Sequence, residues 1–203
     1  MISCVLLAAG LSTRFGSPKA LAFISDKALI EHSQETLINS KVDEVIIVLG
    51  AWREIIDPLI LSASKVRTVF NASYHLGQTS SFKTALLKLS DKCAGIMLLP
   101  IDYPFIKVET INYLVEVFIS KEPLILVPTY NKKKGHPPIF HRRLKTDLMS
   151  LDNTTGINVL AAHYKTDTLL LPVQDQGVTA TFNTPQEFED LKHLADLRIP
   201  EAF

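Results

Sequence analysis

Apolar runs of strand length alternate with amphipathic helical segments in the first part of this chain of 203 residues. The runs span residues 2–8, 44–49, 66–70, 95–101 and 124–128. Between them, apolar side chains recur at the i, i+3, i+4 and i+7 spacing of a helix with one buried face. Three such stripes are Trp52, Ile55, Ile56, Leu59 and Ile60; Phe82, Ala85, Leu86 and Leu89; and Ile111, Leu114, Val115 and Phe118. Strands that are apolar on both faces need cover on both sides. The pattern therefore predicts a three-layer α/β fold, with a mainly parallel sheet between helices.

The elements become shorter after residue 128. They are a turn at 131–135, a strand at 138–141, helices at 142–150 and 155–163, and a strand at 168–173. A last helix is predicted at 185–196, with Thr184 as its cap and Pro185 at its first position. No repeat, linker or low-complexity segment interrupts the sequence, so we expect a single domain over 1–203.

Composition narrows the range of partners. The chain has 21 Lys and Arg against 21 Asp and Glu, so its formal net charge is zero and no broad field attracts nucleic acid or an anionic membrane. No apolar run reaches membrane-spanning length, and the N-terminus lacks the basic segment of a secretory signal. The two cysteines lie in apolar runs, which is typical of reduced, buried thiols. We therefore expect a cytoplasmic protein with neither a nucleic-acid nor a membrane partner.

The segment 7–19 follows the first predicted strand and carries one Arg and one Lys among small residues. Free backbone N–H groups, the fork of Arg14 and the point charge of Lys19 together suit a polyphosphate. A Walker loop is excluded because five residues, not four, separate Gly10 from Gly16. A dinucleotide fingerprint is excluded because no Gly lies two residues after Gly10. The alternative to a phosphate site is a solvated turn.

Two further polar residues follow predicted strands. Asn71 comes after the third strand and Asp102 after the fourth. Ligands gather at the carboxyl ends of parallel strands, so we expect these side chains and the segment 7–19 at one edge of the sheet. A carboxylate at the end of such an apolar strand indicates a bound cation. The alternative is that Asp102 caps the helix expected after Pro104.

Five segments, taken in order, resemble those of the MobA-like nucleotidyltransferases, a group that includes the molybdopterin cytidylyltransferases. They are Leu-Ala-Ala-Gly-x-x-x-Arg-x-Gly-x-x-Lys at 7–19, Asn…Gly-x-x-Ser-Ser at 71–81, Asp-x-Pro at 102–104, Gly-His-Pro at 135–137 and Asn-Thr-Pro-Gln-Glu at 183–187. The last departs from the group's Asp-Thr-Pro-Glu-Asp, with Asn183 replacing Asp. Tyr103 stands where Gln is common in the group.

The resemblance implies the Rossmann-like fold of the nucleotide-diphospho-sugar transferases. It implies an enzyme that couples a nucleoside triphosphate to a phosphorylated acceptor and releases pyrophosphate. Mg²⁺ is the implied cofactor, with Asp102 and Asn183 as its ligands, and Arg14, Lys19 and Asp102 are the implied catalytic residues. The implied nucleotide-binding residues are Leu7, Ala8, Ala9, Gly10, Asn71, Ser80 and Ser81. The implied acceptor-binding residue is His136.

Finer expectations follow from the same resemblance. In this group Ala-Ala-Gly accompanies cytidine and Ala-Gly-Gly guanosine, so Ala9 indicates CTP as the donor. The implied acceptor is a molybdopterin-type phosphate, and a molybdoenzyme or its maturation factor is then a protein partner. Residues 1–128 form the expected nucleotide half and 129–203 the acceptor half.

Several alternatives remain open. In one of them the acceptor is a sugar phosphate, a polyol phosphate or another phospho-acceptor such as a phospho-organic acid. In another, the protein is a nucleotide- or cofactor-binding chaperone with weak catalysis. Asn183, and the pair Ser80 and Ser81, also stand near expected helix starts, where such side chains act as caps.

Overall fold

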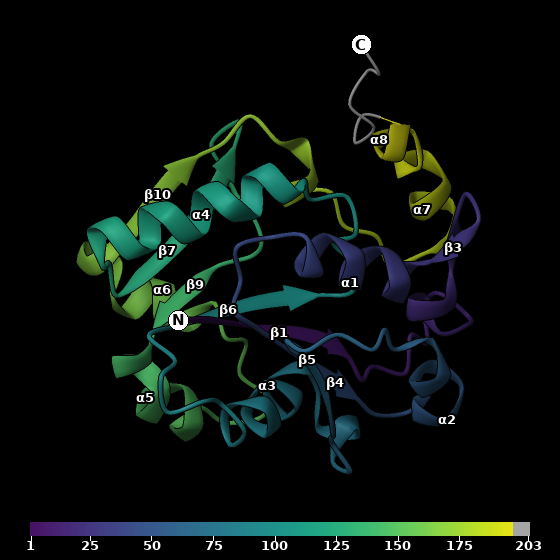
Figure 1. Cartoon of the computed structure of the whole chain (residues 1–203), viewed down its shortest axis with the longest axis horizontal. Coiled ribbons are helices and arrows are strands. Elements are labelled where there is room, and N and C mark those ends of the chain that lie inside the picture. The colour runs from purple at the N-terminus through teal and green to yellow at the C-terminus, as the bar shows by residue number, and fades with distance from the viewer. Residues whose placement is uncertain (197–203) are drawn as a thin grey trace.

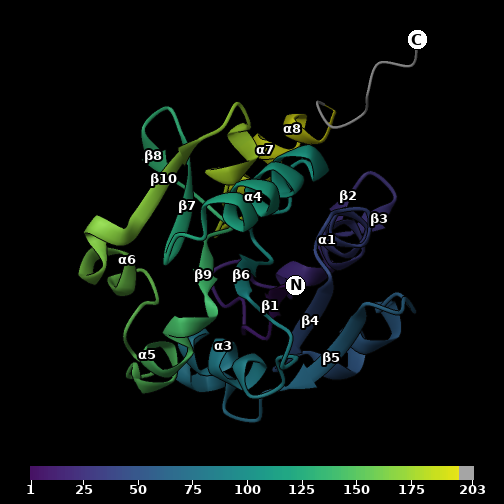
Figure 2. The ribbon, with the colours of Figure 1, turned by 60° about the vertical axis from the view of Figure 1, so that its left-hand side comes forward.

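The computed structural model describes residues 1–196 and places a mostly parallel sheet between helices (Figure 1). The eight-stranded sheet has the order β10-β7-β9-β6-β1-β4-β5, and β8 pairs with β7 outside this path. Its strands are β1 (Ile2–Ala8), β4 (Glu44–Leu49), β5 (Val66–Phe70), β6 (Gly95–Pro100), β7 (Ile125–Tyr130), β8 (Lys133–Lys134), β9 (Ile139–His141) and β10 (Thr168–Pro172). Figure 2 shows β5 and β10 at opposite edges. The pairs β1–β4, β1–β6, β4–β5 and β7–β10 are parallel, whereas β9 is antiparallel to β6 and β7. The predicted α/β fold is confirmed.

Helices cover both faces of the sheet. They are α1 (Leu29–Ile38), α2 (Arg53–Ile56), α3 (Gln78–Leu86), α4 (Val108–Lys121), α5 (Lys145–Ser150), α6 (Val159–His163), α7 (Pro185–Leu191) and α8 (His193–Asp196). One core cluster joins the sheet to α1, α4 and α7, and a second joins it to α3, α5 and α6. Figure 1 shows α1 and α4 on one side of the strands and α3 and α5 on the other.

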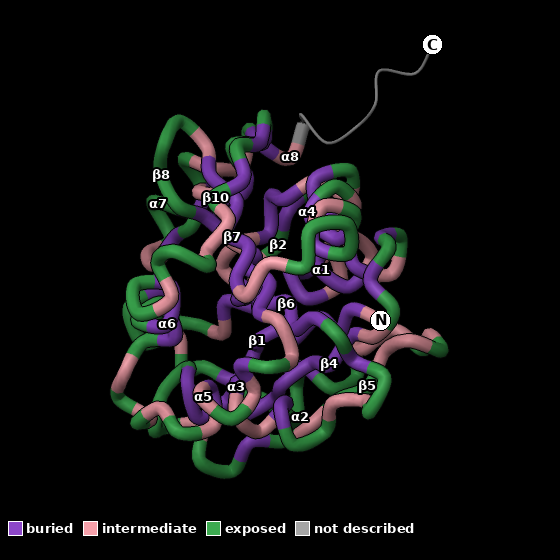
Figure 3. The backbone as a smooth tube through the Cα atoms, turned by 90° about the vertical axis from the view of Figure 1, so that its left-hand side faces the viewer, coloured by how far each residue is buried: buried purple, intermediate pink, exposed green. Residues whose placement is uncertain are grey.

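The strand β1 shows how the sheet separates the two cores. Its side chains alternate, with Cys4 and Leu6 in the cluster under α1 and α4, and Val5 and Leu7 in the cluster over α3. All seven residues of β1 are buried (Figure 3). A strand that is covered on both faces has to be continuously apolar, which explains why its limits were predictable.

The helices depart more from the expectations than the strands do. The stripe at 52–60 forms only the short α2, followed by a 3-10 turn at Asp57–Leu59. Pro58 lies in that turn and has no N–H to continue an α-helix. The expected helix at 155–163 is confined to α6, and the expected last helix is divided into α7 and α8. Helix α1 and the hairpin of β2 (Phe23–Ile24) and β3 (Lys27–Ala28) were not predicted.

The length and hydrophobicity of the helices show whether any of them could cross a membrane. No helix within residues 1–196 combines the length and the hydrophobicity that crossing a membrane requires.

Candidate active site

A cavity of about 440 Å³ opens at the carboxyl ends of the central strands. It is lined by the end of β1 (Leu7 and Ala8) and the segment that follows it, including Ala9 and Gly10, by residues after β4, β5 and β6, and by Asn183. In Figure 1 the arrows of β1 and β6 point to the side of the molecule where α2 and α7 lie. The expectation that the strand ends meet at one edge is therefore confirmed.

The segment after β1 forms a tight turn around Ser12. Ser12 adopts a positive φ of 57°, and its carbonyl accepts hydrogen bonds from the N–H groups of Phe15 (3.0 Å) and Gly16 (3.1 Å). Its hydroxyl accepts a bond from the Lys19 N–H at 3.1 Å. Gly16 has a φ of 81°, a conformation that glycine adopts without steric cost. These bonds set the path of the chain between Gly10 and Lys19.

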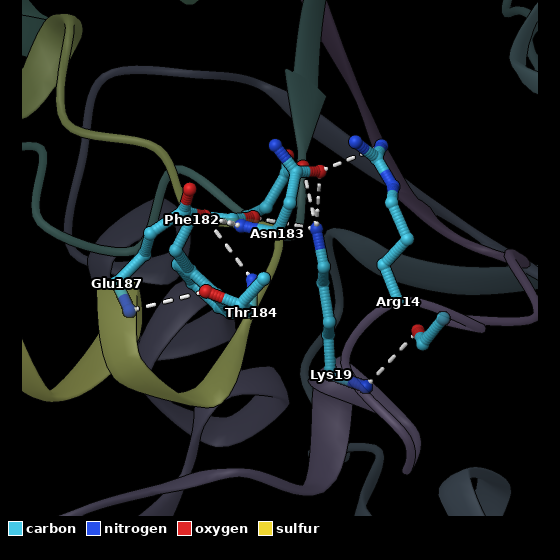
Figure 4. Close-up of polar contacts among 8 residues, drawn as sticks. Arg14, Lys19, Phe182, Asn183, Thr184 and Glu187 are labelled. Atoms are coloured by element: carbon cyan, nitrogen blue, oxygen red, sulfur yellow. Dashed lines mark hydrogen bonds and ion pairs between the residues drawn. The ribbon is translucent and has the colours of Figure 1, made fainter.

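The Lys19 ammonium lies among oxygen atoms from distant parts of the chain (Figure 4). Nζ donates to the Phe182 carbonyl at 2.6 Å, to Asp102 Oδ2 at 3.1 Å and to Asn183 Oδ1 at 3.3 Å. The Lys19 side chain is 11% exposed and that of Asp102 is 24% exposed. A lysine so deeply buried is retained only with such partners, because burial of an unpaired charge is costly.

Arg14 joins this cluster from the solvent side. Its Nη2 donates to Asn183 Oδ1 at 2.9 Å, so one amide oxygen accepts from both cationic side chains. Arg14 is exposed, and this hydrogen bond leaves other N–H groups of its guanidinium for a ligand. The structure thus brings together Arg14, Lys19, Asp102 and Asn183, as the sequence predicts.

The start of α7 fixes the position of Asn183. The Glu187 carboxylate accepts from the Asn183 N–H (2.6 Å) and the Thr184 N–H (3.1 Å), and Thr184 Oγ1 accepts from the Glu187 N–H (3.3 Å). These bonds hold the pKa of Glu187 below its usual value, chiefly through the Asn183 N–H. Thr184 is the helix cap, as predicted. The backbone of Asn183 serves the cap while its side chain faces Lys19 and Arg14.

The oxygen atoms around Lys19 are the donor type that Mg²⁺ prefers. A carboxylate oxygen of Asp102, an amide oxygen of Asn183 and the Phe182 carbonyl already surround one cationic group. Within residues 1–196, the His, Cys, Asp and Glu side chains form no group of three or more that could hold a metal ion. The donor set therefore suits an ion that takes most of its other ligands from a phosphorylated substrate and water.

The polar residues after β5 form a buried network. Asn71 Nδ2 donates to the hydroxyls of Ser80 (3.1 Å) and Ser81 (3.0 Å), and Asn71 Oδ1 accepts from the Ser73 N–H (3.0 Å). Ser81 lines the cavity, whereas Asn71 and Ser80 lie outside its lining. Gly77, not a serine, is the N-cap of α3, so the cap alternative for the serine pair is wrong. Direct contact of Asn71 and Ser80 with a nucleotide stays a prediction.

His136 lies beside the cluster and is stacked on Tyr103. The two ring centroids are 4.3 Å apart, and the His136 N–H donates to the Val178 carbonyl at 2.8 Å. Gly135 is required before it, because a Cβ there would lie 2.3 Å from Val178 O. Burial lowers the pKa of His136 to about 4, against the opposing effect of the Asp102 charge. The imidazole is therefore neutral at pH 7 and offers a hydrogen bond and a ring face rather than a positive charge.

Sequence reasoning missed two features of this cluster. The Phe182 carbonyl is a main-chain group, so residue type carries no signal for it. The stack of Tyr103 on His136 joins residues far apart in the chain, and only the motif positions at 102–104 and 135–137 hinted that they meet.

Comparison with known proteins identifies the family. A family model described as MobA-like NTP transferase domain matches residues 4–168. The chain belongs to the MobA-like NTP transferase family. The family resemblance is thereby confirmed, by a match that spans four of the five sequence segments and ends before the fifth at 183–187.

Two relatives are named "Probable molybdenum cofactor guanylyltransferase". The relative from Geobacillus sp. (strain WCH70) is 26% identical over 193 residues, which cover 92% of this chain and 96% of the relative. The relative from Thermococcus sibiricus is 28% identical over 149 residues, which cover 72% of this chain and 70% of the relative. Together with the family model, these matches support a nucleotidyltransferase of the MobA/MocA type.

Solved structures share the fold. Rv0371c from Mycobacterium tuberculosis H37Rv gives a TM-score of 0.82 at 25% identity, over 95% of this chain and 97% of that one. The structure of Rv0371c in complex with manganese gives a TM-score of 0.79 at 24% identity, over 95% of this chain and 98% of that one. The Streptococcus pneumoniae CTP:phosphocholine cytidylyltransferase gives a TM-score of 0.71 at 17% identity, over 96% of this chain and 99% of that one. The nucleotide-diphospho-sugar transferase fold expected from the sequence is confirmed.

Proposed function

We propose that this MobA-like nucleotidyltransferase transfers CMP from CTP to the phosphate of a molybdopterin-type acceptor and releases pyrophosphate. The observation that carries the proposal is the meeting of Arg14, Lys19, Asp102 and Asn183 at the mouth of the strand-end cavity. Such a cluster combines two cations for phosphate oxygens with two oxygen ligands for a metal ion. An acceptor phosphate oxygen attacks the α-phosphorus, the bond to the bridging oxygen breaks, and the electron pair leaves with pyrophosphate.

Lys19 and Arg14 act on the leaving group. Both side chains reach Asn183 Oδ1, one from the buried side and one from the exposed side, and can share triphosphate oxygens in the same way. Charge on pyrophosphate rises as the bond breaks, so cations held in place before the reaction stabilise the transition state more than the ground state. The buried position of Lys19 removes competing water from this contact.

Asp102 and Asn183 are the residues that would hold the divalent cation, which we propose to be Mg²⁺. When bound, the cation neutralises phosphate charge and aligns the reacting oxygens. Asp102 brings the only full negative charge of this pair, while Asn183 adds a neutral oxygen. In the free protein Lys19 balances the charge of Asp102 (3.1 Å).

The acceptor side is proposed around His136 and Tyr103. A neutral imidazole packed against a phenol ring, at an interplanar angle of 31°, supplies aromatic faces of the kind that a pterin ring packs on. The proposal assigns 1–128 chiefly to the nucleotide and 129–203 chiefly to the acceptor, with Asn183 as the contribution of the second half to the phosphate end. A molybdoenzyme or its maturation factor would receive the product.

CTP is proposed on the evidence of Ala9. The position carries Ala in the cytidine-type signature, and Ala9 is buried against Gly50, where an added Cβ would lie 2.8 Å from the Ala9 Cβ. GTP is the second candidate, because two relatives are named probable molybdenum cofactor guanylyltransferases. The two differ in one measurable quantity, the ratio of kcat/KM values for the two donors.

Pyrophosphate release tests the proposal directly. The protein is incubated with Mg²⁺, each of the four NTPs, and molybdopterin, sugar phosphate or polyol phosphate acceptors. We expect CTP to exceed GTP by about tenfold in kcat/KM, a difference of about 1.4 kcal/mol. We expect Ala9→Gly to reduce that ratio while the protein stays folded. Equal or better use of GTP by the unmodified chain would replace CTP with GTP, and turnover with sugar phosphates alone would replace the acceptor. Tight NTP binding without pyrophosphate from any acceptor would favour the chaperone alternative.

A further inference from the structure

Trp52 is the single tryptophan of the chain and lines the cavity that also contains the charged cluster. It follows β4, is 36% exposed, and its indole N–H donates to the Leu11 carbonyl at 3.2 Å. The neighbouring Ala51 N–H donates to the Ala9 carbonyl at 3.2 Å. The turn after β4 is thus bonded at two points to the segment after β1. The indole is held in place while part of its surface stays accessible.

The two ends of the cavity differ in chemistry. On the β6 and β1 side lie the charged and metal-binding groups, Lys19 and Asp102 among them. On the β4 and β5 side lie Trp52, Ile56 and Tyr74. The strands follow the order β6-β1-β4-β5. Since adjacent strands are about 4.8 Å apart, the cavity edge extends about 14 Å from the charged side to the aromatic side.

A nucleoside triphosphate has the same polarity, with a polyanion at one end and an aromatic base at the other. The charged cluster can take only the triphosphate, so the base is directed to the aromatic side. Tyr74 is already packed there, because Gly50 lacks the Cβ that would lie 2.7 Å from the Tyr74 Cβ. Tyr74 also contacts the core and the ring of His75, at a centroid distance of 6.0 Å.

We infer that the indole of Trp52 is the surface on which the base of the nucleotide stacks. This inference rests on the proposed function and adds to it a residue that none of the five signature segments contains. Stacking is available to every base, so Trp52 contributes affinity for CTP and GTP alike and leaves the choice between them to other groups. Its hydrogen bond to Leu11 keeps the ring in one orientation before the nucleotide arrives.

The single tryptophan makes the inference directly measurable. Emission is recorded during titration with Mg²⁺ and CTP, GTP or inorganic tripolyphosphate, and free N-acetyltryptophanamide corrects for light absorbed by the nucleotides. We expect CTP and GTP to quench the emission and tripolyphosphate, which has no base, to bind without quenching. Equal quenching by tripolyphosphate would overturn the inference, because the indole would then respond to the phosphate segment and not to a base.

Variants separate stacking from the hydrogen bond to Leu11. By calorimetry, Trp52→Ala is expected to weaken CTP and GTP binding at least about tenfold and to leave tripolyphosphate binding unchanged. Trp52→Phe loses the N–H but keeps a ring, so its affinity should stay within about threefold of the unmodified protein. Tyr113→Ala removes an aromatic side chain that is 45% exposed on α4 and serves as the matched control.

The outcomes also distinguish failure of the inference from failure of the proposed function. If Trp52→Ala binds CTP as tightly as the unmodified chain, or if Trp52→Phe is as weak as Trp52→Ala, stacking on the indole is overturned while nucleotide binding stands. If the unmodified chain binds none of the four NTPs in the presence of Mg²⁺, the proposed function fails and the inference fails with it.

Discussion

At the residue scale, the replacement of Asp by Asn at position 183 decides the charge of the site. A second carboxylate beside Asp102 would neutralise more of the positive charge of Lys19 and Arg14. The amide keeps an oxygen that we propose as a metal ligand, 3.3 Å from Lys19 Nζ and 2.9 Å from Arg14 Nη2, without adding that charge. Both cations therefore keep more of their attraction for a triphosphate, at the expense of affinity for a free metal ion.

Asn183→Asp is accordingly expected to tighten the binding of Mn²⁺ alone by roughly tenfold, since an added carboxylate raises affinity for a hard cation. Electron paramagnetic resonance of free Mn²⁺ measures this affinity without nucleotide. Asn183→Ala, which removes the oxygen, should weaken it. Unchanged affinity in both variants would show that the side chain of Asn183 lies outside the metal site.

Asp102→Ala is expected to lower Mg²⁺-dependent turnover at least a hundredfold, on the order of 3 kcal/mol, because it removes the carboxylate that we propose as the charged metal ligand. Lys19 keeps its bonds to Phe182 and Asn183 but loses the compensating charge of Asp102, so the thermal unfolding midpoint is also expected to fall, and turnover is compared well below that midpoint. Asp91→Ala, an exposed carboxylate before β6, is the matched control. The rate of pyrophosphate release in a single turnover measures this loss. If Asp102→Ala keeps more than a tenth of the normal rate, Asp102 lies outside the metal site.

At the scale of elements, the start of α7 connects helix stability to catalysis. Thr184→Ala removes the acceptor for the Glu187 N–H and is expected to cost about 1 kcal/mol. For a chain of this size that lowers the unfolding midpoint by about 2 to 4 °C. Because the same turn orients Asn183, the KM for NTP should rise as well, and Thr184→Ser should restore both quantities. A lowered midpoint with an unchanged KM would mean that Asn183 is positioned independently of the cap.

The strands were more predictable than the helices for a physical reason. Strands buried on both faces have to be mostly apolar, and the buried strands β1 and β4 have the limits that the sequence predicts. The edge strand β5 also has its predicted limits, although Arg67 and Thr68 in it are exposed. Helix α1 escaped prediction because its buried face contains Ser33 and Gln34. The Gln34 amide bonds to the carbonyls of Ile30 and Leu59, each at 3.0 Å, so a polar side chain is satisfied inside the core and interrupts the apolar stripe.

The candidate site was likewise predictable from the sequence only in part. Arg14, Lys19 and Asp102 could be grouped from the sequence because strand ends meet at one edge of a parallel sheet, and the family resemblance added Asn183 to them. The Phe182 carbonyl and the aromatic wall at Trp52 could not, since they depend on main-chain geometry and on which loops face the cavity. Asn71 and Ser80 were correctly expected near the carboxyl-end edge of the sheet, whereas the hydrogen bond from Asn71 Nδ2 to the Ser80 hydroxyl could be found only in the structure.

At the scale of the whole molecule, the charged cluster joins segments from both ends of the chain. Arg14 and Lys19 follow the first strand, Asp102 follows β6, and Phe182 and Asn183 precede α7. A ligand that binds this cluster therefore stabilises the chain as a unit, not one loop. Linkage gives about 2.7 kcal/mol of stabilisation at a ligand concentration one hundred times Kd.

The last prediction follows from that connection. Saturating Mg²⁺ and CTP are expected to raise the unfolding midpoint by about 5 to 10 °C, and EDTA to reverse most of the shift. Hydrogen exchange measured by mass spectrometry should show protection at 10–19 and at 182–187 together, because one triphosphate with its cation contacts both. Asp102→Ala should lose protection at both segments, whereas Asp91→Ala should retain it. Protection confined to 10–19 would contradict the shared site, since it would mean that the triphosphate binds the first loop without engaging Asn183.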